Sequence, residues 1–274
     1  MIRTYYWYDR VSGWKFPAYK VLGLDVSRRF KVGNAGDIYT KNVISYVYNE
    51  ESINIKNKGS RLLTVGSILH LSKPGDVICG AGVKSENLLD INVLNECYFH
   101  ALRGPKSYDI LKKNNVNLSN VSFLYDPGLM IRYMFDFEAI KPTEGKRIFI
   151  PHYRERKKYY NFKDIEVVDI DDDPINVARK ICSAEVIYTS SLHGVIFSHS
   201  LNRICILIQP QTIEPAFKYE DYYSSIGVDM PQMANSIYDA LTLPVPISPL
   251  ELKIKEEEFI FPDKATLSKY NIMA

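Results

Sequence analysis

A chain of 274 residues with a formal net charge of +2 lacks the strong positive charge of a nucleic-acid-binding domain. With 46% hydrophobic and 24% charged residues, the composition is that of an ordinary soluble globular protein, and no apolar run approaches the roughly 18 residues of a membrane span. The length suits one large domain or two domains of about 130 residues each. Cysteines 79, 97, 182 and 205 lie far apart in apolar segments, which indicates buried thiols. The five histidines show no ligand spacing, so no metal site is expected.

The chain begins with an apolar segment and then a turn rich in small residues. Residues 2–8 predict a strand, without the basic start and long apolar core of a signal peptide, and a loop with Gly13, Trp14 and Pro17 follows. The stretch Gly33-Asn34-Ala35-Gly36-Asp37 then predicts a tight turn that permits close backbone approach to a ligand, with Asp37 capping the next helix. A substrate loop that ends in a carboxylate and a simple capped helix both remain open.

The next strands of this half also end in small or charged residues. Strands predicted at 62–65 and 76–79 run into Gly66-Ser67 and Gly80-Ala81-Gly82, which is typical of the carboxyl edge of an open parallel sheet, where ligands bind. The strand at 98–102 ends in Arg103. An arginine at the end of a buried strand is costly unless it meets an anion, so we expect Arg103 to face a ligand, with a solvated arginine as the alternative.

After a strand at 123–125 and an irregular linker at 135–146, the alternation of strand and helix starts again. Strands are predicted at 147–150, 165–170, 185–189 and 204–208, and a helix at 174–182. The strand that ends at Thr189 passes through two serines into a helix that begins at Leu192. Free N–H groups at a helix start form an anion site, and His193 lies in the first turn, where a proton donor can act on a bound anion.

This order predicts an α/β fold with two Rossmann-like domains that face each other across a cleft. The N-terminal domain is expected at residues 1–140 and the C-terminal domain at 147–245. A helical tail is expected at 246–274, with a charged helix at 250–258 packed on the outside.

Taken in order, the motifs resemble those of the polysaccharide pyruvyltransferases. The similarity spans roughly residues 32–228 and depends on the order and spacing of the motifs together. The matching segments are Gly36-Asp37, Gly66-Ser67, Gly80-Ala81-Gly82, Arg103-Gly104-Pro105-Lys106-Ser107, Asp126-Pro127, Leu192-His193-Gly194, and Lys218 with Asp221-Tyr222. The resemblance implies a glycosyltransferase-B-like pair of domains. It also implies transfer of the enolpyruvyl group of phosphoenolpyruvate to two hydroxyls of a sugar, which forms a pyruvate ketal and releases phosphate.

The same resemblance implies the setting of the reaction. The donor is phosphoenolpyruvate, and no metal, nucleotide or other cofactor is expected. The acceptor is a saccharide of a polysaccharide or of its precursor, for which a polyprenyl-diphosphate-linked form is one candidate. The expected location is the cytoplasm, with peripheral association at the inner face of the membrane during capsule or exopolysaccharide assembly.

The chemistry of the donor suggests roles for individual residues. C3 of phosphoenolpyruvate must take a proton while a sugar hydroxyl attacks C2, and the two anionic groups need cations. We expect His193 to be the acid, because a bound anion raises the pKa of a histidine. We expect Arg103 to hold one anionic group, the N–H groups of residues 191–194 to hold the other, and Asp37 to orient or deprotonate the acceptor. Further substrate contacts are expected from Asn34, Gly36, Ser67, Gly82, His152, Arg154, Ser190, Ser191, Leu192, Gly194 and Lys218.

One position departs from the family pattern, and other interpretations stay open. Some members carry an arginine directly before the Leu-His pair, where this chain has Ser191, so Arg154, Lys218, Lys84 or the serine hydroxyls are candidates to replace it. His193 and His152 also suit buried structural histidines. A nucleotide-sugar glycosyltransferase would need an acidic residue for the ribose, a role open to Glu214. In a non-catalytic glycan-binding member, Arg103 and His193 need not converge.

Overall fold

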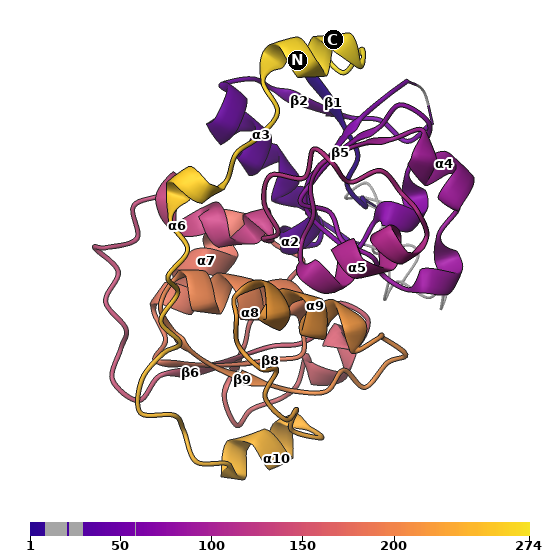
Figure 1. Ribbon diagram of the computed structural model, residues 1–274. Helices are drawn as coiled ribbons and strands as arrows, with labels where there is room; N and C mark the ends of the chain where they lie inside the picture. The colour runs from indigo at the N-terminus through magenta and orange to yellow at the C-terminus, as the bar shows by residue number, and fades with distance from the viewer. Residues whose placement is uncertain (9–20, 22–29, 58) are drawn as a thin grey trace.

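The computed structural model describes residues 1–8, 21, 30–57 and 59–274, and shows an α/β fold with two parallel sheets (Figure 1). The loop predicted at Gly13 to Pro17 lies outside the described residues. The first sheet contains β1 (Ile2–Thr4), β2 (Ser52–Asn54), β3 (Leu62–Leu63), β4 (Val77–Cys79) and β5 (Tyr98–Ala101), in the order β2-β1-β3-β4-β5. The second contains β6 (Arg147–Ile150), β7 (Glu166–Val167), β8 (Val186–Thr189) and β9 (Ile204–Leu207), in the order β7-β6-β8-β9. Parallel sheets with crossover helices are consistent with the Rossmann-like fold that the alternation predicts.

The helices also divide between the two halves of the chain, each of which contains one sheet. The first half holds α2 (Ala35–Ile38), α3 (Thr40–Tyr48), α4 (Ile91–Asn95), α5 (Pro105–Lys113) and α6 (Ile131–Met134). The second half holds α7 (Pro174–Cys182), α8 (Leu192–Ser200), α9 (Phe217–Ser225) and α10 (Ile237–Thr242), and α11 (Lys264–Lys269) lies in the tail. The predictions of a helix at 174–182 and of one that begins at Leu192 are confirmed.

Alternation along each strand sends side chains into different cores. In β3, Leu62 enters one core and its neighbour Leu63 enters another, because successive strand residues point to opposite faces. In β6, Ile148 and Ile150 point to the same core as Leu62, whereas Phe149 points to a third core, which packs against α10. Figure 1 shows α10 on the face of the second sheet that is opposite to α7 and α8.

One hydrophobic core is shared by the two halves of the chain. It contains Val43 and Leu62 from the first half, and Ile187 and Val195 from the second, all inaccessible to solvent. Helix α8 packs against the 3₁₀ turn at Pro127–Met130 and against α2 and α6, which are all elements of the first half. A large apolar interface of this kind opposes free hinge motion between the two sheets.

The tail differs from the prediction. The segment expected as a helix at 250–258 forms only a 3₁₀ turn at Glu256–Glu258, because tertiary packing overrides its charged helical pattern. The apolar side chains of Ile254 and Phe259 are buried in the shared core and hold residues 250–258 against the first half. The expected strand at 123–125 is also wrong, since Phe123 makes only an isolated bridge with Ala101.

Candidate active site

The strand order predicts where each sheet binds a ligand. The direction of strand addition reverses between β1 and β3 in the first sheet and between β6 and β8 in the second, and ligands bind beyond the carboxyl ends of strands at such points. One cavity of about 410 Å³ lies at both positions. It is lined by Tyr5 and Trp7 after β1, by residues 66–67 after β3, by residues 152–154 after β6 and by residues 191–193 after β8.

The start of α8 contributes backbone N–H groups to this cavity. Ser191 is the N-cap, its side chain makes no capping hydrogen bond, and the first-turn N–H groups therefore keep their capacity for an anion. The hydroxyl of Ser190 is used elsewhere, because it donates to Glu155 and accepts from the N–H of His152 at 2.8 Å. Of the two serine hydroxyls expected to bind an anion, the structure thus leaves only that of Ser191 at the cavity.

His193 is buried at the cavity wall against the glycine loop of the first half. A Cβ added to Gly36 would lie 1.9 Å from His193 Nδ1, so only glycine permits this approach. Burial lowers the pKa of His193 to about 3, and the charges of Arg103 and Lys218 act in the same direction. Its Nε2 has no hydrogen-bond partner among the described residues. The imidazole is therefore neutral at physiological pH.

Asp37 lines the cavity, and Asn34 rather than Asp37 caps the helix. The side chain of Asn34 accepts the N–H of Gly36 at 3.2 Å, which corrects the predicted capping role of Asp37. Burial raises the pKa of Asp37 to about 7, although Lys218 and Lys84 oppose the shift. A carboxyl group that titrates near neutral pH can take up or release a proton during a reaction.

Arg103 lies behind the cavity wall, and this corrects its expected contact with a ligand. Its guanidinium is fully buried and pairs with Asp221 of α9 at 2.9 Å, while it also donates to Ser67 Oγ and to the carbonyl of Val83. A Cβ at Gly82 would lie 2.3 Å from Arg103 Cζ, so the second motif glycine makes room for the arginine. The buried charge is compensated within the protein, and Ser67 is the group between Arg103 and the cavity.

The four cations of the cavity wall, namely Lys56, Lys84, Arg154 and Lys218, differ in their pairing. Arg154 lies 2.9 Å and Lys218 3.0 Å from the carboxylate of Glu214, which is almost inaccessible to solvent. Burial lowers the pKa of Lys218, and Glu214 opposes that shift. Lys56 and Lys84 have no ion pair among the described residues, and of these two it is Lys84 whose charge lowers the pKa of Asp37. Lys84 is therefore the unpaired wall cation whose charge acts on the titratable groups of the site.

Nine of the fourteen residues predicted for the site line the cavity. These are Asn34, Asp37, Ser67, His152, Arg154, Ser191, Leu192, His193 and Lys218. The other five, namely Gly36, Gly82, Arg103, Ser190 and Gly194, stand behind the wall and support it. For example, a Cβ at Gly194 would lie 2.2 Å from Thr189 Oγ1.

The sequence analysis did not select the aromatic residues of the wall. Tyr5, Trp7 and Tyr153 line the cavity together with His70. Tyr5 and Trp7 directly follow the first strand, and Tyr153 follows the first strand of the second half. The place of Tyr153 after a predicted strand was a signal for that residue, whereas Tyr5 and Trp7 were expected inside a strand at 2–8 that in fact ends at Thr4.

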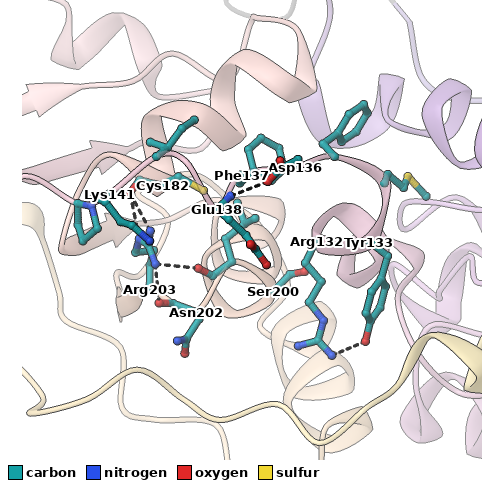
Figure 2. A pocket seen from close by; sticks show the side chains of 15 residues that line it. Arg132, Tyr133, Asp136, Phe137, Glu138, Lys141, Cys182, Ser200, Asn202 and Arg203 are labelled. Carbon is teal, nitrogen blue, oxygen red and sulfur yellow. Dashed lines mark hydrogen bonds between the residues drawn. The ribbon is translucent and has the colours of Figure 1, made fainter.

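A larger cavity of about 860 Å³ surrounds the linker, and Figure 2 shows its lining. The guanidinium of Arg203 donates there to the carbonyls of Cys182, Leu201 and Asn202. Arg132 donates to Tyr133 and to the carbonyl of Ile254. Because both arginines are occupied by their own chain, this cavity is a weaker candidate for ligand chemistry than the one at the strand ends.

The described residues contain no group of His, Cys, Asp and Glu side chains that could hold a metal ion. All four cysteines are free thiols. In the same part of the chain, no helix combines the length and apolarity needed to cross a bilayer.

Comparisons with known proteins identify one family model and several distantly similar proteins. A family model described as polysaccharide pyruvyl transferase matches residues 34–211. An uncharacterized protein of Acanthamoeba polyphaga mimivirus is 28% identical over 73% of each chain. The succinoglycan biosynthesis protein ExoV of Rhizobium meliloti is 22% identical over 61% of this chain, and the match covers 54% of ExoV. A solved structure of an uncharacterized protein from Klebsiella pneumoniae has a TM-score of 0.47 and 16% identity, over 78% of this chain and 94% of that one.

Proposed function

The chain belongs to the polysaccharide pyruvyl transferase family, and from this premise we propose that it transfers the enolpyruvyl group of phosphoenolpyruvate to a saccharide. Two hydroxyls of the acceptor each form a bond to C2 of the donor, the bond from C2 to the phosphate oxygen breaks, and a cyclic ketal results. Of the two hydroxyl protons, the equivalent of one reaches C3 and the other leaves with phosphate. The observation that carries the proposal is that the start of α8, His193, Lys84 and Asp37 line one cavity.

The charges of the wall suit a donor with two anionic groups. Lys84 and the N–H groups at the start of α8 would bind one of them, since both are free of competing partners among the described residues. Lys84 would thus supply the positive charge that some family members place directly before the Leu-His pair. Lys218 and Arg154 would bind the other anionic group while they remain paired with Glu214. Arg103 would act through Ser67, whose hydroxyl it orients.

His193 and Asp37 would divide the proton transfers. A donor anion beside the neutral imidazole raises its pKa, so the acid form of His193 would appear only in the complex with donor. Asp37, with its pKa near 7, would accept a proton from the attacking hydroxyl. Binding of the donor would thereby generate the acid that the reaction needs.

The fold and the setting are part of the same proposal. The two sheets would form a glycosyltransferase-B-like pair of units, with boundaries near residues 140 and 147 and a tail from residue 246. The name of the relative ExoV points to exopolysaccharide biosynthesis, and a capsule or a polyprenyl-diphosphate-linked acceptor would suit the same chemistry. We place the reaction in the cytoplasm, at the inner face of the membrane, and without a cofactor.

The test measures phosphate release from phosphoenolpyruvate in the presence of a panel of bacterial oligosaccharides. The product should gain the mass of pyruvate less one water. His193→Gln should abolish turnover, whereas His199→Gln serves as the matched control on the same helix, because His199 bonds to Tyr222 and does not line the cavity. Full turnover by His193→Gln would refute the acid role.

A nucleotide-sugar glycosyltransferase is the second candidate, and the pairing of Glu214 counts against it. That carboxylate is held by Arg154 and Lys218, so it is not free to accept bonds from a ribose. Thermal stabilisation by phosphoenolpyruvate but not by nucleotide sugars is the expected result. The reverse result would favour the glycosyltransferase.

A further inference from the structure

An aromatic wall closes one side of the cavity, and we define it as Trp7 and Tyr153. The two rings come from the ends of β1 and β6, one from each half, with centroids 5.2 Å apart and planes inclined by 48°. The ring of Phe30, which is fully buried, packs against both at 5.4 and 5.8 Å. Arg154 Nε donates to the hydroxyl of Tyr153 at 2.8 Å. The wall is therefore held in place before any ligand binds.

Polar groups without partners share the cavity with this wall. The Nδ1 atoms of His152 and His70 have no hydrogen-bond partner among the described residues, and His152 is only 4% exposed. Asn34 and Asp37 also line the cavity. A ligand that suits this combination has an apolar face for the rings and hydroxyl groups along its edge.

We propose that the aromatic wall binds the acceptor, with the C–H face of a pyranose ring against Trp7 and its hydroxyls directed to Asp37 and His152. The inference rests on the proposed function and adds which side of the cavity takes the acceptor. Lys84 and the start of α8, which line the same cavity, are left to the donor. Asp37 lines the same cavity, as a base for the attacking hydroxyl requires.

Two substitutions at one position separate ring stacking from simple packing. Trp7→Phe keeps an aromatic face, whereas Trp7→Leu keeps apolar volume without one. We expect Trp7→Leu to raise the KM for the saccharide about three- to tenfold, as the loss of a stacking contact implies, and Trp7→Phe to stay close to wild type. The dissociation constant of phosphoenolpyruvate, measured by calorimetry without acceptor, should keep its wild-type value in both. Tyr238→Leu, on the exposed side of α10, is the control for loss of an aromatic residue.

The outcomes distinguish this inference from the proposed function. Equal KM values for Trp7→Leu and Trp7→Phe would overturn the stacking role, and an equal loss of phosphoenolpyruvate affinity would assign the wall to the donor. If no saccharide is pyruvylated at all, the proposed function fails, and binding alone is measured by saturation-transfer NMR with methyl glycosides of glucose, galactose, mannose and their N-acetylamino forms. Saturable binding that is lost in Trp7→Leu would still support binding of a saccharide by the aromatic wall. Absence of binding to every glycoside would overturn it.

Discussion

Replacing Gly36 with alanine tests whether the contact between the glycine loop and His193 determines activity. The new Cβ would lie 1.9 Å from His193 Nδ1, and an ordinary contact begins near 3.4 Å, so the ring must move by about 1.5 Å. A misplacement of about 1 Å in a reacting group can cost about 100-fold in rate. We therefore expect Gly36→Ala to lower kcat for pyruvyl transfer by about 100-fold or more.

The loss of stability should be comparable in free energy to the loss of rate, since 100-fold in kcat corresponds to about 2.7 kcal/mol. Overpacking of a well-packed region costs typically about 1–3 kcal/mol, and Gly36 lies in a helix with ordinary backbone angles, so no backbone strain is added. Phosphate release and urea unfolding are measured on the same samples. Gly145→Ala is the matched control, because no atom lies within 4 Å of its added Cβ, although its positive φ of 71° costs some stability. If Gly36→Ala kept most of the wild-type kcat, the close packing would not position His193 for catalysis.

Three further substitutions test other parts of the site. Asp221→Asn leaves the buried Arg103 without its counter-charge, so the free energy of unfolding in urea should fall by about 3–5 kcal/mol, and no change would show that the pair is dispensable. The raised pKa of Asp37 means that the folded state keeps a proton which the unfolded state loses, so Asp37 contributes a decline in stability as pH rises from about 4 to about 7, whereas the lowered pKa of His193 contributes in the opposite direction. Asp37→Asn should remove that part of the decline in pH-dependent unfolding, and an identical pH profile would contradict the raised pKa. Lys84→Ala should weaken phosphoenolpyruvate binding about tenfold in calorimetry while Lys84→Arg retains it, and equal losses in both would argue against a charge contact.

The sequence predicted the features that depend on neighbouring residues. The strand that ends at Thr189, the turn of small polar residues and the helix that begins at Leu192 form one local pattern, and all three are confirmed. The place of His193 in the first turn follows directly from that pattern. The burial of Arg103 was also foreseeable, because it follows an apolar strand.

The partner of that arginine was not foreseeable, because it lies 118 positions further along the chain. The expected anion for Arg103 was a ligand, and the structure provides Asp221 instead. The sequence also named Arg154, Lys218 and Lys84 as candidates to replace the missing arginine. Glu214 pairs with the first two, which leaves Lys84 among these three. The prediction of a helix at 250–258 was wrong for a related reason, because the burial of Ile254 depends on a surface formed by distant residues. Long-range contacts, rather than local propensity, decided each of these points.

The core that crosses between the two halves has a consequence for protein engineering. In a modular enzyme, halves from two relatives can be exchanged to combine one donor with another acceptor. Here Val43 and Leu62 pack in the same core as Ile187 and Val195, so a foreign half would bring mismatched volumes to a buried surface. A new acceptor preference is therefore better sought by single changes at the cavity wall than by recombining halves of different chains.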